Sequence, residues 1–509
     1  MPFLRADAGA TLDGERYTCR DPRMSRDQGR SQLRRIARRA MVERGLLPGF
    51  SREALAEADR LAPETDGSAR DMRELLWASI DNDDSRDLDQ LSVAEPLAGG
   101  AARVLVAIAD VDAGAPKGSA IDEHARTNTT SVYTAAEIFP MIPERLSTDL
   151  TSLGEGEERL AVVVAMTVDA GGEVTEADIQ RALVRNHARL TYDGVAAWLE
   201  GGAAPARLAA VPGMDDQIRM QDRAAQAMKR LRHERGALRV ETTEARAVFD
   251  GDALADMRRV EKNRAKELIE DLMIAANGAT ARYLEARGFP SLRRVLRAPR
   301  RWDRIAELAA ELGEKLPAEP DPAALDAFLA RRRAVAPERF ADLSVSVVKL
   351  LGSGEYALEL PGQESEGHFG LSARDYTHST APNRRFPDLA TQRLLKAAID
   401  GRPVPYSNEE LDALARHCTV QEDAAAKVER QVRKSAGALL LSSRIGEEFD
   451  AIVTGASEKG TWVRVLPPGP AVDGKVTRGA DGLDVGDRTR VELVRTDVER
   501  GFIDFARAR

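Results

Sequence analysis

The stretch IDNDDSRDLDQLSVAE, residues 80–95, is the feature on which the interpretation of this chain depends. It places five aspartates within nine positions, namely Asp81, Asp83, Asp84, Asp87 and Asp89. Carboxylates at this density repel one another, and a hard divalent metal ion is the simplest cation that would neutralise them. The stretch therefore predicts metal chemistry.

Two simpler explanations of an acidic run have to be weighed. Most such runs are solvated surface loops. A calcium loop of the EF-hand kind is excluded, because a loop that starts at Asp81 has Arg86 where glycine is needed and Ser92 where glutamate is needed. The flanking runs LLWASI (75–80) and LVAIADVD (105–112) are apolar and typical of buried strands, which favours a site over a solvated loop.

Composition limits the class of protein. At 509 residues the chain is long enough for two to four domains, and its 43 % apolar content is ordinary for a globular protein. Cys19 and Cys418 are too far apart in sequence to indicate a disulfide framework, and the histidines show no zinc spacing. No apolar run reaches the roughly 18 residues of a membrane helix, and residues 1–16 do not resemble a signal peptide. We therefore expect a cytoplasmic protein without membrane contact.

The net charge of −9 opposes nucleic-acid binding at first sight, because phosphate contacts depend on Lys and Arg. The segment 16–44, however, carries ten arginines against three acidic residues. Its apolar residues recur at helical spacing with arginines on the other face, and a second helix is expected from an N-cap at Ser51 to about Leu61. The two helices fit either a helix-turn-helix that contacts nucleic acid or a solvated packing pair. The apolar residues are Leu33, Ile36, Ala37, Ala40 and Met41.

The rest of the chain divides into a mixed segment and a β-rich end. Residues 160–184 predict two strands joined at Gly171-Gly172, whereas 213–238 and 257–288 predict helices. Mixed elements without strict alternation indicate an α+β domain. From about Gly446 onward, short alternating runs broken by Gly, Pro and Asp predict a small all-β barrel of the OB-fold type.

The motifs, taken in order, resemble the ribonuclease II family of RNB-domain exoribonucleases. In that family an Ile-Asp is followed six residues later by Asp and then by a pair of acidic residues; the stretch quoted above has Ile80-Asp81, Asp87 and Asp89, but Gln90 in place of the last acidic residue. Together with that stretch, six further segments span about 320 residues in the family's order. They are VAIADVDAGAPKGSAIDEHARTNTTSVY (106–133), FPMIPERLSTDLTSL (139–153), HARLTYDGVAAWLE (187–200), ELIEDLMIAAN (267–277), HFGL (368–371) and YTHSTAPNRRFPDLATQRLLKAAI (376–399).

The resemblance assigns the reaction chemistry. It implies that Asp81, Asp87 and Asp89 hold Mg²⁺. Gln90 stands where the family has a further aspartate, and its carboxamide oxygen could ligate the ion without contributing charge. Arg384 in APNRRF matches the family's catalytic arginine, whose planar donors suit the charge of a phosphoryl transition state. For an isolated arginine a surface ion pair would be the simpler reading, and Arg385 is the alternative candidate.

The resemblance also implies RNA contacts. Tyr133 and Tyr192 occupy positions near the 3′ end of the substrate, although a tyrosine in a strand is more often part of the core. Glu270 would accept hydrogen bonds from the terminal ribose, or is only a helix-surface carboxylate, and Glu429 is a second candidate of this kind. Trp462 either stacks on a base or belongs to the core of the barrel. The segment 237–249 offers no convincing aromatic partner for Tyr133.

These inferences predict three domains: a helical N-terminal domain (1–70), a catalytic RNB domain (71–445) and an OB-fold RNA-binding domain (446–509). The helical start departs from better-known relatives, which carry two cold-shock barrels there. The expected function is hydrolytic 3′→5′ degradation of single-stranded RNA to nucleoside 5′-monophosphates with Mg²⁺, without an obligate protein partner. Two alternatives stay open: a catalytically weak RNA-binding protein that retains the fold, and a metal hydrolase of small phosphoesters.

Overall fold

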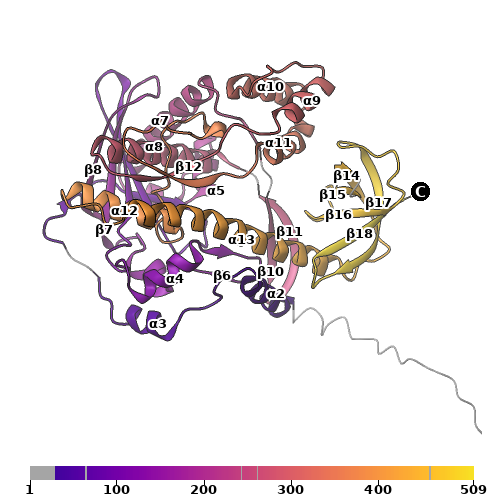
Figure 1. The fold of residues 1–509 in the computed structure, drawn as a ribbon, viewed down its shortest axis with the longest axis horizontal. Coiled ribbons are helices and arrows are strands. Elements are labelled where there is room, and N and C mark those ends of the chain that lie inside the picture. Colours follow the sequence, from indigo (N-terminus) through magenta and orange to yellow (C-terminus); the bar gives the residue numbers. More distant parts are fainter. Residues whose placement is uncertain (1–28, 64–65, 242–243, 261, 458–459, 509) are drawn as a thin grey trace, which may run out of the picture.

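The computed structural model describes residues 29–63, 66–241, 244–260, 262–457 and 460–508. Cys19 and the first four arginines of the basic segment lie outside the described residues. A mixed sheet with covering helices forms one end of the molecule and a small barrel forms the other, and the long helix α13 (Asn408–Leu441) runs between them (Figure 1). This arrangement confirms the predicted α+β domain with a carboxyl-terminal β-barrel.

The sheet of the larger part has seven strands in the order β1-β8-β7-β4-β3-β2-β9. The β1–β8 and β2–β9 pairs are parallel and the other pairs are antiparallel. Its central strands are buried along most of their length, which explains why their sequences are continuously apolar. The strands are β1 (Arg70–Asp71), β2 (Ala78–Asp81), β3 (Gln90–Pro96), β4 (Ala102–Ala109), β7 (Glu158–Val168), β8 (Val174–Arg185) and β9 (Ala188–Thr191).

Helices pack against this sheet and extend its core. The predicted strand pair within 160–184 and the predicted helix within 213–238 are confirmed as β7–β8 and α7. The helix predicted from residue 257 begins instead at Arg264, after an N-cap at Asn263, because residues 253–260 pair as a strand with residues 244–250. The helices are α4 (Ala120–Asn128), α5 (Tyr192–Leu199), α6 (Ala206–Ala209), α7 (Met214–Glu234), α8 (Arg264–Ala286) and α12 (Phe386–Ile399).

Smaller units are attached to this core. The hairpin β10–β11 and the ribbon β5–β6 lie beside α13, and three helices form a separate hydrophobic cluster near the paired strands β12 and β13. Within the described residues, no helix is both long and apolar enough to span a bilayer. The bounds are β5 (Val132–Tyr133), β6 (Ile138–Phe139), β10 (Glu244–Asp250), β11 (Ala253–Val260), β12 (Ser291–Val295), α9 (Trp302–Glu311), α10 (Pro322–Val335), α11 (Pro337–Leu351) and β13 (Glu355–Glu359).

The amino-terminal helices are α2 (Gly29–Glu43) and α3 (Arg52–Ala58). The five predicted apolar residues of α2 are buried, and Ser51 caps α3 as expected by accepting a hydrogen bond from the Ala54 N–H. However, α2 packs on α13, whereas α3 packs on α4. The two helices are therefore anchored on different elements and do not form one helix-turn-helix unit, and their contact with nucleic acid stays a prediction.

The carboxyl-terminal barrel is closed, with strand order β14-β15-β16-β18-β17. Its core is continuous with side chains from outside the barrel, including Leu33 and Ile36 of α2 and Ala436 and Leu441 of α13. The barrel is therefore not packed independently of the rest of the chain. Its strands are β14 (Glu448–Ser457), β15 (Gly460–Val465), β16 (Asp473–Arg478), β17 (Arg488–Asp497) and β18 (Phe502–Arg507).

Candidate active site

The aspartate loop, residues 81–89, connects β2 to β3 at the end of the sheet. Asp81 is the last residue of β2 and pairs with Thr191, so that it lies beside Tyr192 at the start of α5. One oxygen of Asp81 accepts hydrogen bonds from the Ser85 hydroxyl at 2.8 Å and the Asn82 N–H at 2.7 Å. Arg189 of β9 fixes the loop by donating to the carbonyls of residues 83 and 85 at 2.6 and 2.8 Å.

Asp89 connects the aspartate loop to the arginine loop, residues 380–385. Asp89 is buried, and its two oxygens accept hydrogen bonds from the Asn383 N–H at 2.9 Å and from Arg384 Nε at 3.3 Å. Burial raises the pKa of Asp89 to about 7, although the Arg384 charge and the Asn383 N–H oppose this shift. The two loops are thus joined through one carboxylate.

Arg384 lies just before α12, and contacts from several elements set its position. Its carbonyl accepts hydrogen bonds from the Ser131 N–H at 2.9 Å and the Thr130 hydroxyl at 3.2 Å. Its side chain remains 45 % exposed and interacts electrostatically with Asp89, Tyr133 and Asp81. The guanidinium is therefore tethered on one side and open to a ligand on the other.

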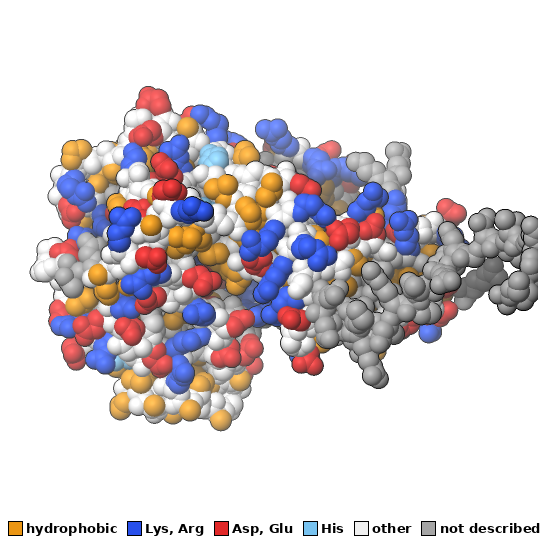
Figure 2. Space-filling model, turned by 90° about the horizontal axis from the view of Figure 1, so that it is seen from below, with side chains coloured by type: hydrophobic (Ala, Val, Ile, Leu, Met, Phe, Trp, Pro, Cys, Tyr) orange, Lys and Arg blue, Asp and Glu red, His pale blue; other side chains and the backbone are white. Residues whose placement is uncertain are grey.

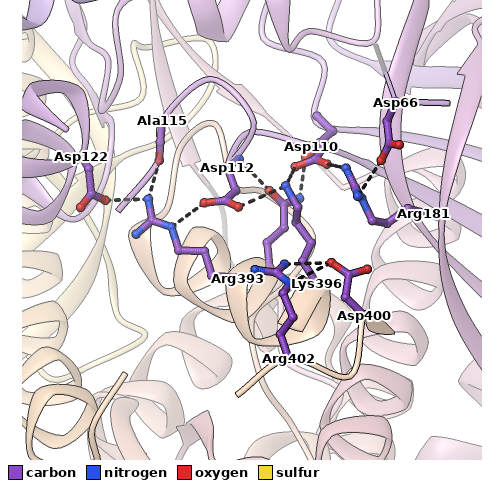
Figure 3. Close-up of polar contacts among 12 residues, drawn as sticks. Asp66, Asp110, Asp112, Ala115, Asp122, Arg181, Arg393, Lys396, Asp400 and Arg402 are labelled. Atoms are coloured by element: carbon purple, nitrogen blue, oxygen red, sulfur yellow. Dashed lines mark hydrogen bonds and ion pairs between the residues drawn. The ribbon is translucent and has the colours of Figure 1, made fainter. Parts of the chain in front are cut away.

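A buried ionic network fixes α12 behind this loop (Figure 3). Lys396 contacts Asp110 at 2.8 Å and Asp112 at 3.1 Å, while Arg393 contacts Asp112 at 2.8 Å and Asp122 at 2.7 Å. The partners of the two cations follow β4 or belong to α4. Removing one member of such a network leaves a buried charge without its counter-ion, so the network holds α12 in one position relative to the sheet.

The two predicted tyrosines lie at this site. The Tyr133 hydroxyl donates to Asp87 at 3.0 Å, and the Tyr133 N–H donates to Glu429 of α13 at 2.8 Å. Partial burial of the hydroxyl and the nearby Asp87 charge raise the pKa of Tyr133, so it stays a protonated donor. Burial and the charge of Asp81 likewise raise the pKa of Tyr192. The structure therefore brings both tyrosines to the aspartate loop.

The carboxylates of Asp81 and Asp87 are the kind of hard oxygen donor that Mg²⁺ prefers, although the ligand oxygens of Asp81, Asp87 and Asp89 do not all lie within 4.8 Å of one another in this structure. Within the described residues, no hydrogen-bond donor contacts the second oxygen of Asp81 or of Asp87, so each carboxylate keeps one oxygen for a ligand. Asp89 differs, because both of its oxygens already hold the arginine loop. Gln90 opens β3 and pairs with Ile108, and strand alternation directs its side chain away from that of Asp89. A role for Gln90 as a ligand stays a prediction.

A second acidic group lies elsewhere in the domain. Carboxylate oxygens of Glu285, Glu359 and Asp375 lie within 4.8 Å of one another. Arg293, which is buried, pairs with Glu359 at 2.7 Å and with Glu285 at 3.6 Å. This cluster is therefore already neutralised in part by an arginine, unlike the free oxygens of the aspartate loop.

The other residues predicted to contact RNA, all within the described part of the chain, do not bond to the aspartate loop. Glu270 on α8 forms an ion pair with Lys262. Arg385 contacts Asp388 at 2.7 Å instead of the aspartate loop, and Glu429 acts through the backbone of Tyr133. The Trp462 side chain on β15 is half-buried, whereas its neighbours Thr461 and Val463 are buried. The Lys475 ammonium lies 5.7 Å from the centre of the Trp462 ring. Trp462 therefore faces out of the barrel and is not a core residue.

Sequence reasoning missed several supporting groups. Asn383 and Ser131 position the arginine loop through their backbone N–H groups. Because any residue except proline can donate such a bond, the residue type at these positions does not reveal it. Arg246 of β10 pairs with Asp84, and this contact joins segments far apart in the chain. Asn383 and Ser131 both lay inside quoted segments, 376–399 and 106–133, but nothing in those segments indicated their backbone contacts.

Comparisons with known proteins agree with this geometry. The profile of the RNB domain matches residues 69–401, and that of the RNase II-type exonuclease C-terminal S1 domain matches residues 447–508. The chain therefore belongs to the RNB-domain family, which confirms the resemblance to ribonuclease II. RNB-family nucleases are metal-dependent.

Relatives and solved structures extend the comparison. Ribonuclease R of Escherichia coli (strain K12) is 32 % identical over 409 residues, which cover 78 % of this chain and 49 % of that protein. Ribonuclease R 1 of Lactococcus lactis is 28 % identical over 453 residues, which cover 86 % of this chain and 54 % of that protein. The chain thus spans about half the length of these curated relatives.

Two solved structures share the fold. Mycoplasma genitalium RNase R in complex with ribose methylated single-stranded RNA has a TM-score of 0.83 at 21 % identity, covering 93 % of this chain and 77 % of that one. Yeast Ssd1, a pseudonuclease, has a TM-score of 0.66 at 16 % identity, covering 89 % of this chain and 56 % of that one. The fold is therefore shared with a protein described as a pseudonuclease, and activity has to be argued from the site.

Proposed function

We propose that this protein is a hydrolytic 3′→5′ exoribonuclease that degrades single-stranded RNA to nucleoside 5′-monophosphates with Mg²⁺. One observation carries the proposal. Asp89 holds Arg384 beside a loop in which Asp81 and Asp87 each keep a free carboxylate oxygen. An anion-binding arginine next to unsatisfied carboxylates suits a phosphodiester bound between a metal ion and a guanidinium.

In this proposal Asp81 and Asp87 would hold the metal ion. The ion would neutralise phosphate charge and supply hydroxide near neutral pH. Arg384 would contact the non-bridging oxygens of the scissile phosphate, and Asp89 would orient its donor fork. The Tyr133 hydroxyl would keep Asp87 in place from the substrate side, because it donates to one Asp87 oxygen and leaves the other free.

RNA binding in this proposal involves more than the reacting phosphate. Tyr133 and Tyr192 would lie near the terminal nucleotides, and Trp462 would offer a stacking surface on the barrel. The face of the molecule seen in Figure 2 has Lys and Arg side chains gathered near its middle, where the catalytic domain meets the barrel. A local concentration of basic side chains is compatible with phosphate binding despite the net charge of −9.

A second candidate function is RNA binding with weak or no catalysis. Gln90 favours it, because the family's further acidic residue is missing there, and the fold also occurs in a pseudonuclease. An assay with 5′-end-labelled single-stranded RNA, in Mg²⁺ and in EDTA, distinguishes the two. We expect stepwise shortening from the 3′ end and release of 5′-monophosphates in Mg²⁺ alone. RNA that is bound but stays intact in Mg²⁺ would support the second candidate.

A further inference from the structure

The ribbon β5–β6 has one buried face and one exposed face. Val132 and Phe139 pair across the ribbon, and both are buried in a hydrophobic cluster with α2 and α13. Tyr133 and Ile138 pair on the opposite face, where they are 41 % and 58 % exposed. Isolated apolar side chains at a surface are ordinary. These two are adjacent, however, and one of them, Tyr133, contacts Asp87 in the aspartate loop.

The strand geometry makes Tyr133 and Ile138 one continuous surface. The Thr134 N–H donates to the Glu137 carbonyl at 3.1 Å and closes the ribbon one residue beyond this pair. The Tyr133 N–H points away from β6 toward Glu429. Tyr133 and Ile138 are therefore a non-hydrogen-bonded pair, in which opposite side chains approach most closely, with Cβ atoms about 4.5–5.5 Å apart.

The ribbon is held in place from three sides. Its Tyr133 hydroxyl contacts Asp87 in the aspartate loop, and Glu429 of α13 accepts from its backbone. From α2, Arg38 pairs with Glu137, and Arg34 Nε donates to the carbonyl of residue 136 at 3.4 Å. The exposed face is thus fixed in the protein before any substrate binds.

We propose that Ile138 is a further substrate-positioning residue, which forms with the Tyr133 ring the surface on which a base near the 3′ end of single-stranded RNA stacks. This inference rests on the proposed function. It also accounts for the missing aromatic partner of Tyr133, because Phe249, the only aromatic residue in 237–249, is covered by the Arg30 guanidinium at 4.4 Å. An aliphatic contact of this kind accepts any base, as a sequence-independent nuclease requires.

The test compares RNA affinity of the full-length protein and of Ile138→Ala in EDTA, where no cleavage occurs. The probes are a short single-stranded oligoribonucleotide and versions that lack the base at the terminal or the penultimate position. We expect Ile138→Ala to bind the intact oligomer roughly three- to tenfold more weakly, the scale of losing one apolar contact. For one of the two abasic oligomers this difference should disappear, and Ile138→Phe should restore affinity for the intact one.

Val420→Ala is the matched control, because Val420 on α13 is an aliphatic residue of similar exposure, 64 % against 58 % for Ile138. Equal affinity of Ile138→Ala and wild type for the intact oligomer would overturn the inference. If Ile138→Ala lost the same affinity on both abasic oligomers as on the intact one, the inference would also be overturned, because the side chain would then not contact a base. If the wild-type protein did not bind RNA, the proposed function would be overturned as well. The wild-type affinity therefore distinguishes failure of the proposed function from failure of the inference about Ile138 alone.

Discussion

At the residue scale, Asp89 and Arg384 act as one unit. Asp89 is buried, and both of its oxygens bind the arginine loop, while the Arg384 side chain stays accessible. Asp81 and Asp87 each keep one carboxylate oxygen without a hydrogen bond from the described residues, as a ligand to a metal ion requires. Substitutions at these positions should therefore separate two effects: loss of the ion and loss of the arginine that faces it.

Arg384→Lys keeps the positive charge and removes the planar donor fork. We expect kcat to fall roughly a hundredfold or more, the scale of one lost transition-state donor, with little change in RNA affinity measured in EDTA. Arg385→Lys is the matched control, because Arg385 pairs with Asp388. A defect limited to RNA affinity would make Arg384 an ordinary phosphate contact.

The raised pKa of Asp89 predicts pH-dependent metal binding. Its pKa of about 7 means that the carboxyl is charged above pH 7 and neutral below it. An ion bound beside Asp89 favours the charged form, so Mg²⁺ affinity should fall by up to about tenfold per pH unit below 7. Calorimetric titration at pH 6, 7 and 8 measures this. Asp89→Asn should bind more weakly but without this pH dependence, and a wild-type affinity constant from pH 8 to 6 would contradict the prediction.

At the element scale, α2 supports the ribbon β5–β6. The contact runs through Arg38 and Glu137, with Phe139 packed beneath the helix. Arg38 is 55 % exposed in its side chain, so loss of the pair should be modest in energy. The role of α2 is thus to hold the ribbon that carries Tyr133, whether or not its arginines also reach RNA.

Arg38→Ala tests that role. We expect KM for a short RNA to rise by about two- to fivefold, on the scale of one exposed ion pair, with no change in the salt dependence of RNA binding. Arg35→Ala on the same helix is the control, because Arg35 is exposed and lies outside the contacts with the ribbon. A smaller salt dependence in Arg35→Ala would show instead that α2 binds phosphates directly.

The elements that sequence predicted well are those with local signals. The strands around the aspartate loop, the Ser51 cap and the apolar face of α2 follow from periodicity and capping chemistry. The start of α8 was predicted too early, because the charged run MRRVEK gives no hint that residues 253–260 pair with 244–250. The contacts Tyr133–Asp87 and Asp89–Asn383 join distant segments, so residue types alone could not reveal them.

At the scale of the whole molecule, the barrel shares its core with α2 and α13. Removing the barrel would expose that core, so a surface substitution tests its role better. Trp462→Ala should weaken binding of long RNA about tenfold, the range of one lost base stack, and leave cleavage of short oligomers unchanged. Phe502→Ala, another exposed aromatic of the barrel (55 %), is the control. Equal loss on short oligomers would place the barrel within the active channel.

The proposed mechanism requires the aspartate loop to hold a metal ion close to Arg384. Anomalous diffraction from crystals soaked in Mn²⁺, a hard cation that replaces Mg²⁺ at oxygen sites, locates the ion without depending on turnover. We predict an anomalous peak within about 2.0–2.4 Å of the free oxygens of Asp81 and Asp87. A peak among Glu285, Glu359 and Asp375, with none at the aspartate loop, would contradict it.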